Sequence, residues 1–88
     1  MTAWRVVPTE GFARQLRKLD RQTAARVIAA LDAVVESGDP RSLGRALSGP
    51  LAGLRRYRGG SWRVLCELRD DALVVLALEV GKRDHVYD

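Results

Sequence analysis

The sequence predicts a small α+β protein in which a helical hairpin packs on one face of an antiparallel-rich sheet. Apolar residues recur at helical spacing in two segments between residues 9 and 36, and three runs rich in strand formers follow in the second half. A short strand at the start completes the expected order β-α-α-β-β-β. At 88 residues the chain forms a single domain, residues 1–88, with one modest core.

The first forty residues predict a strand and two amphipathic helices. The run "AWRVV" is rich in strand formers and ends at Pro8, and Thr9 and Asp20 are suitable N-caps for the helices that follow. Apolar stripes identify the two helices: Phe12, Leu16 and Leu19 in the first, and Ala24, Val27, Ile28, Leu31, Val34 and Val35 in the second. The breaker sequence "SGDP" at 37–40 ends the second helix.

The second half predicts a connector and three strands. Residues 41–53 are rich in Gly, Ser and Pro and are expected to be irregular, with at most a short helical turn. "LRRYR" and "SWRVLCEL" flank a "GG" hairpin turn, and "ALVVLALEV" follows after "RDD". Alternation places Trp62, Val64, Cys66 and Leu68 on one face of the middle strand. The last strand is apolar on both faces and is therefore predicted to be central.

Positive charge is concentrated in one segment. The chain carries a net charge of +4, but residues 41–63 contain six arginines and no acidic residue. Arginine presents a planar fork of donors that matches phosphate groups, so a local concentration of it indicates a polyanionic partner, most often nucleic acid. The alternative is a solvated basic face without a ligand.

Several classes of protein are not expected. Cys66 is the sole cysteine, which rules out an internal disulfide and a cysteine-based zinc site and suits a reducing cytoplasm. The longest apolar run has nine residues and the N-terminus lacks the apolar segment of a signal peptide, so no membrane association is expected. Gly-rich phosphate loops and metal-binding motifs are missing, so we expect no cofactor and no metal.

Two clusters carry the candidate chemistry. In "LRRYRGGSWR" the hairpin turn should bring Arg56, Arg58 and Arg63 to one side of the sheet. Trp62 could stack on a base, although an aromatic residue in a strand is more often part of the core. In the ending "VGKRDHVYD", an extended backbone would place Arg83, His85 and Tyr87 on one face. The alternative for this ending is a solvated polar tail.

Together these segments resemble a known family. The order of the elements, the hairpin "LRRYRGGSWRVLCEL" and the ending "LEVGKRDHVY" resemble the RelE/ParE superfamily of bacterial toxins from type II toxin–antitoxin pairs, across nearly the whole chain. The ending is more similar to the RelE branch than to the ParE branch. The resemblance implies a RelE-like fold, which is similar to that of microbial ribonucleases, and an mRNA interferase that cleaves mRNA in the ribosomal A site.

The resemblance also implies roles for individual residues. Arg63 matches the hairpin arginine that stabilises the phosphate, Arg83 the arginine of the "G(H/K)R" motif, and Tyr87 the near-terminal catalytic tyrosine. Arg56 matches one of two basic residues in the outgoing strand. The other position of that pair is Leu54, a departure for which Arg58 could compensate. Family members often continue past the tyrosine with a short helix, whereas this sequence stops one residue later.

RNA cleavage without a metal explains why such residues would be useful. Attack by the 2′-OH needs a base, cations for the crowded phosphorane and a proton for the leaving oxygen. Tyr87 is a usable base only if nearby guanidinium groups lower its pKa, and His85 is a possible auxiliary acid because its reference pKa is near neutral. Arg58 is a second possible auxiliary residue. The side chains expected to contact RNA are Arg55, Arg58 and Lys82.

Three functions remain open at this point. The chain is expected to be a ribosome-dependent mRNA endonuclease, a ParE-type toxin that inhibits DNA gyrase by binding, or an inactive member that only binds its antitoxin. A cognate antitoxin is the expected partner in each case, and antitoxins often shield the basic face of the toxin. The other expected partners are mRNA and the ribosome, with operator DNA contacted only through the antitoxin complex.

Overall fold

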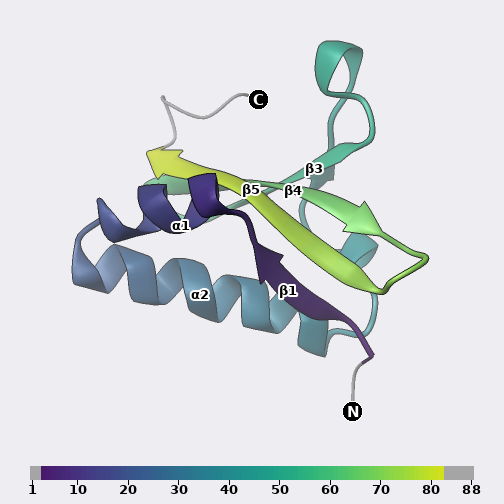
Figure 1. Ribbon diagram of the computed structural model, residues 1–88, viewed down its shortest axis with the longest axis horizontal. Coiled ribbons are helices and arrows are strands. Elements are labelled where there is room, and N and C mark those ends of the chain that lie inside the picture. Colours follow the sequence, from purple (N-terminus) through teal and green to yellow (C-terminus); the bar gives the residue numbers. More distant parts are fainter. Residues whose placement is uncertain (1–2, 83–88) are drawn as a thin grey trace.

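The computed structural model describes residues 3–82, which form two helices packed on a five-stranded mixed sheet (Figure 1). The predicted α+β fold class is therefore confirmed. In chain order the elements are β1 (Arg5–Pro8), α1 (Glu10–Arg17), α2 (Arg21–Glu36), the 3₁₀ turn η1 (Pro40–Ser42), β2 (Arg45–Ala46), the 3₁₀ turn η2 (Gly49–Leu51), β3 (Leu54–Arg58), β4 (Trp62–Arg69) and β5 (Val74–Lys82).

The strands lie in the order β1-β5-β4-β3-β2. Strand β1 runs parallel to β5, and every other neighbouring pair is antiparallel. Because β5 has a partner on each side, the prediction that the last strand is central is confirmed. Its core residues Val75, Ala77 and Val80 face the helices, whereas Leu76 and Glu79 lie on the outer face of the sheet and are half-buried.

Both helices begin at the predicted caps. The Thr9 hydroxyl accepts a hydrogen bond from the Phe12 amide at 3.1 Å and also donates to the Ala77 carbonyl at 3.0 Å, which ties the start of α1 to β5. The Asp20 carboxylate caps α2 by accepting from the Thr23 amide at 3.0 Å. Hydrogen bonding from the Thr23 side chain, together with that from its amide, lowers the pKa of Asp20.

The core lies between the helices and one face of the sheet. Trp62 and Val64 belong to it, together with Cys66, so the prediction that these side chains share one face of the middle strand is correct, despite a β-bulge between Leu65 and Cys66. The other buried core residues are Phe12, Val27, Leu31, Val34, Val35, Tyr57, Val75, Ala77 and Val80. One member of the predicted apolar stripe differs: Ile28 is 48% exposed, because α2 turns it away from the sheet.

The segment predicted to be irregular contains a two-residue strand and two 3₁₀ turns. Strand β2 pairs with β3, and the connection between them projects from the body of the molecule (Figure 1). The chain enters β2 at Gly44, which has a φ of +73°. A β-carbon there would lie 2.6 Å from both the Tyr57 ring and the Arg56 carbonyl oxygen, so only glycine permits this close approach.

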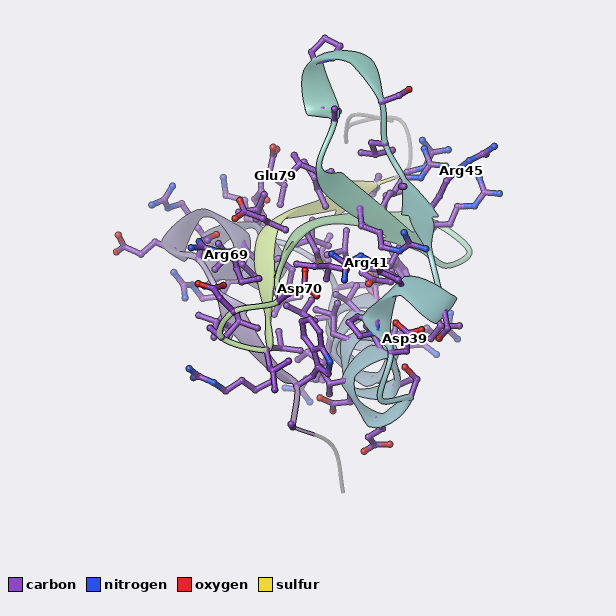
Figure 2. The ribbon with its side chains drawn as sticks, turned by 90° about the vertical axis from the view of Figure 1, so that its right-hand side faces the viewer. Asp39, Arg41, Arg45, Arg69, Asp70 and Glu79 are labelled. Carbon is purple, nitrogen blue, oxygen red and sulfur yellow. The ribbon has the colours of Figure 1, made fainter. Side chains whose placement is uncertain are left out.

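The connector before β2 is held by three side chains. Arg41 forms a bidentate ion pair with Asp70, with both N–O distances 2.8 Å, and the two side chains point toward each other in Figure 2. The hydrogen bonds from Arg41 lower the pKa of Asp70. Arg55 donates from Nε to the Leu43 carbonyl at 2.7 Å and from Nη2 to the Arg41 carbonyl at 2.8 Å. The buried Tyr57 hydroxyl donates to the Pro40 carbonyl at 2.7 Å.

Replacing Tyr57 with phenylalanine should destabilise the fold by about 1 kcal/mol, because the hydroxyl is lost and the Pro40 carbonyl loses its donor. Burial raises the pKa of Tyr57 from 10.0 to about 12. The folded state therefore holds this proton more tightly than the unfolded state does. The resulting stability is fully present below pH 10 and is lost as the pH rises toward 12.

Urea denaturation of both proteins between pH 8 and 11 provides the test. Burial also raises the pKa of Cys66 to about 12, so both proteins should lose stability in alkali. The loss above pH 10 should be smaller in the Tyr57→Phe variant. Parallel pH profiles for the two proteins would contradict this assignment.

Candidate functional site

The outer face of the sheet, opposite the helices, carries four arginines at one end. Arg58 in β3 lies directly opposite Arg63 in β4, and Arg45 in β2 lies directly opposite Arg56 in β3. Strand alternation puts all four side chains on the face away from Tyr57 and the core. We call this set, Arg45, Arg56, Arg58 and Arg63, the arginine cluster.

The members of the arginine cluster differ in exposure. Arg56 and Arg63 are only 7% and 8% exposed, whereas Arg45 and Arg58 are exposed to solvent. Figure 2 shows Arg45 extending away from the body of the molecule at the base of the projecting connection. A guanidinium group that is partly removed from water acts more strongly on a nearby anion. The cluster therefore combines two buried, fixed cations with two that can reach outward.

A groove of about 570 Å³ lies beside the arginine cluster. Its lining includes Ala33 and Val34 of α2, the aromatic residues Tyr57 and Trp62, and three arginines of the cluster: Arg45, Arg56 and Arg58. None of the lining residues is acidic. This lining of apolar, aromatic and basic residues suits a ligand or partner that carries negative charge.

Among the predicted RNA contacts, Arg55 stands apart. It lies on the opposite face of β3 from Arg56 and Arg58 by strand alternation. Its guanidinium group donates to backbone carbonyls of the connector, as described above. This geometry assigns Arg55 a part in shaping the connector and does not place its side chain with the arginine cluster.

The structure describes only some of the site residues that were predicted near the end of the sequence. Lys82 is exposed, and β5 ends with Gly81 opposite Arg63 and Lys82 opposite Trp62. The candidates Arg83, His85 and Tyr87 lie outside the described residues. Their proposed roles therefore remain predictions.

The described residues offer cations more readily than acids or bases. Burial keeps the pKa of Tyr57 at about 12, so this phenol stays protonated near neutral pH and cannot act as a general base there. Within residues 3–82 no group of three or more His, Cys, Asp or Glu side chains lies close enough to hold a metal ion. No helix in the same range is long and apolar enough to span a membrane. The described residues therefore form a basic surface that is suited to an anion.

Sequence reasoning missed Arg45 as a member of this site. The residue belongs to segment 41–63, which contains no acidic residue. This concentration of positive charge was the feature of the sequence that could have indicated Arg45 as a site residue. Its position depends on β2, a strand of two residues that shows no periodicity. Only the pairing with β3 brings Arg45 beside Arg56.

Comparisons with known proteins agree with this architecture. The chain resembles the RelBE2 toxin–antitoxin complex of Mycobacterium tuberculosis at 28% identity, covering 92% of this chain and 99% of that one with a TM-score of 0.84. The isolated E. coli RelE toxin is 21% identical over 91% and 84% of the two chains, with a TM-score of 0.75. The RelE–RelB complex of Pyrococcus horikoshii is 20% identical over 96% and 99%, with a TM-score of 0.70.

Sequence comparison leads to the same group of proteins. No curated protein matches the sequence significantly. The family model for the ParE toxin of the type II toxin–antitoxin system parDE matches residues 6–87, which is almost the whole chain. The solved structures are RelE toxins whereas the matching family is that of ParE, so these comparisons do not separate the two branches. The chain belongs to the ParE toxin family of type II toxin–antitoxin systems, within the RelE/ParE superfamily that its sequence resembles.

Proposed function

We propose that this toxin is a metal-independent endoribonuclease that enters the ribosomal A site and cleaves mRNA there. The observation that carries the proposal is the arginine cluster, in which Arg56 and Arg63 are nearly buried on a sheet face that Arg58 shares. Cations held in fixed positions are suited to the negative charge that develops on the phosphorane in the transition state. A basic surface that only improved solubility would not need two buried arginines.

The proposed mechanism gives each residue a distinct task. Arg56, Arg63 and Arg83 stabilise the charged phosphorane, because arginine holds its proton too tightly to serve as an acid. Tyr87 is the proposed base for the 2′-OH, with its pKa lowered by the guanidinium groups around it. His85 is the proposed auxiliary acid for the leaving 5′-oxygen.

Outside the chemical step, the proposal assigns RNA contacts to other basic residues. Arg58 and Lys82 are exposed at the ends of β3 and β5, where they can reach a longer RNA. Arg55 supports the site through the connector, as its carbonyl contacts indicate. Catalysis by this arrangement would take place in the cytoplasm, where ribosomes translate mRNA.

The proposed partner is a cognate antitoxin. The Mycobacterium tuberculosis structure that this chain resembles is a toxin–antitoxin complex. The groove, which apolar, aromatic and basic residues line, provides a surface that an acidic antitoxin segment would cover. Contact with operator DNA would then occur only through the antitoxin in that complex.

Inhibition of DNA gyrase by binding is the second candidate function, because the matching family is that of ParE toxins. A third candidate is an inactive member that only binds its antitoxin, since Leu54 replaces a basic residue expected in active relatives. Both alternatives need the fold and the antitoxin partner, and neither needs a group that transfers a proton.

Expression of the toxin alone provides the discriminating experiment. We expect growth arrest with new mRNA 5′ ends inside reading frames, mapped on ribosomes, and cleaved mRNA in a purified translation reaction. Supercoiling by purified gyrase should be unaffected by the same protein. Lost supercoiling with intact mRNA would support gyrase inhibition, and no effect in either assay would indicate an inactive member.

A further inference from the structure

Strand β5 has two different neighbours along the edge that faces away from β4. Strand β1 pairs with β5 over residues 74–77. Beyond Pro8 the chain turns into α1, which lies beside the remaining part of β5, as Figure 1 shows. Buried backbone amides and carbonyls are almost always hydrogen-bonded, so those on this part of the edge need partners that β1 does not supply.

Two side chains of the α1 region supply such partners. The Thr9 hydroxyl, besides capping the helix, donates to the carbonyls of Ala77 at 3.0 Å and Leu78 at 3.2 Å. Gln15 accepts at Oε1 a hydrogen bond from the Val80 amide, with an N–O distance of 2.8 Å. Val80 is only 2% exposed, so its amide would be costly to leave without an acceptor.

These contacts lie at an irregularity in β5. The pairing with β4 passes from Leu65–Glu79 to Cys66–Ala77, which leaves Leu78 as the extra residue of the β-bulge. A bulge interrupts the ladder and bends the strand, so the direction of the strand after it depends on additional contacts. The two contacts from the α1 region hold the bulge itself and the second residue after it.

The part of β5 after the bulge leads to the proposed catalytic residues. Gly81 lies directly opposite Arg63 of β4. Strand β5 ends at Lys82, and the sequence continues directly with Arg83 and, four residues later, with Tyr87. The direction in which β5 leaves the sheet therefore determines where the proposed cation and base can lie relative to Arg63.

We propose that Gln15 is a positioning residue for the proposed ribonuclease site and acts through its hydrogen bond to the Val80 amide. The proposal rests on the proposed function, because it takes Arg63, Arg83 and Tyr87 to act together in catalysis. Gln15 bonds to the backbone of β5 and needs no contact with RNA. Its task is to keep the end of β5 in one direction, and reaction rates are sensitive to the resulting alignment of the reacting groups.

Three variants separate positioning from a general role in folding. Gln15→Ala removes the acceptor, whereas Gln15→Glu keeps an oxygen acceptor on a side chain of the same length. Gln22→Ala is the matched control, since Gln22 is exposed at the start of α2 and undergoes the same change. Thermal melting sets an assay temperature at which every protein is folded. Gln15→Met, which keeps the length of the side chain without its amide, replaces Gln15→Ala if that variant does not fold.

Amide hydrogen exchange followed by NMR measures the contact itself. In Gln15→Ala the Val80 amide should exchange about tenfold faster than in wild type, relative to the Val75 amide. Val75 is the internal reference because both β1 and β4 pair with β5 there. In Gln15→Glu and Gln22→Ala, exchange at Val80 should stay close to the wild-type rate.

Cleavage of mRNA on programmed ribosomes measures the consequence for activity. The kcat of Gln15→Ala should fall about tenfold to a hundredfold with KM nearly unchanged, because the variant misplaces reacting groups and leaves the binding surface intact. Gln15→Glu should recover most of kcat, and Gln22→Ala should match wild type. A residue that only stabilised the fold would lower the melting temperature and leave the kcat of the folded protein unchanged.

Three other results would overturn the proposal, and they differ from one another. Unchanged exchange at Val80 in Gln15→Ala would show that this hydrogen bond does not hold β5. Faster exchange with unchanged kcat would make Gln15 a structural residue only, and the ribonuclease function would stand. If the wild-type protein cleaves no mRNA, the ribonuclease function fails and this role of Gln15 fails with it, whatever the exchange rates are.

Discussion

Substituting glutamine for Arg63 should reduce mRNA cleavage in the translation reaction about 10²-fold to 10³-fold. This is the usual effect of removing one fixed group that stabilises transition-state charge. Arg63 lies in β4 with only 8% of its surface exposed, opposite Arg58 and Gly81. Arg63→Lys keeps the charge but loses the planar fork, so it should recover only part of the activity.

Arg69→Gln is the matched control, since Arg69 belongs to the same strand and is exposed at its other end. Its ion pair with Glu67 is a surface contact at 3.4 Å, which contributes little to stability. Circular dichroism and thermal melting should show that the Arg63 and Arg69 variants are all folded. Full toxicity in folded Arg63→Gln would mean that the outer face of the sheet is not the catalytic surface.

The elements with local signals were predicted from the sequence. Thr9 and Asp20 both act as caps because their side chains bond to amides three residues later, a contact that depends only on local sequence. The interior position of β5 in the sheet followed from its nearly continuous apolar run, which is typical of a strand with a partner on each side. The pairing of β1 with β5 in parallel had no such signal, because parallel partners are joined through distant crossovers.

The candidate site was likewise predicted only where the local sequence determines the direction of the side chains. Alternation around the hairpin was sufficient to place Arg56, Arg58 and Arg63 on one face. The same rule places Arg55 on the other face of β3. The prediction that Arg55 contacts RNA was based on its charge and did not take the direction of its side chain into account. Arg45 could not be found, because its position depends on Gly44 and on carbonyl contacts that join residues distant in sequence.

Replacing Trp62 with alanine should destabilise the protein by about 3–5 kcal/mol, which is typical of removing a buried aromatic side chain. Trp62 is 6% exposed and belongs to the core. A β-carbon at Gly59 would lie 2.5 Å from the indole ring, so the hairpin turn packs directly on this residue. A chain of this size has a stability of roughly 5–10 kcal/mol, so the alanine variant should be close to unfolding at 37 °C.

Trp62→Phe separates the role in the core from the alternative role of stacking on an RNA base. It should cost about 1–2 kcal/mol in urea denaturation, because most of the apolar surface is retained and the cavity is small. If Trp62 acts through the core, the folded phenylalanine variant should cleave mRNA at nearly the wild-type rate. Its packing against Gly59 explains this expectation, because the ring supports the turn that sets Arg58 opposite Arg63. An alanine variant as stable as wild type, but unable to cleave mRNA, would instead require the indole to contact RNA directly.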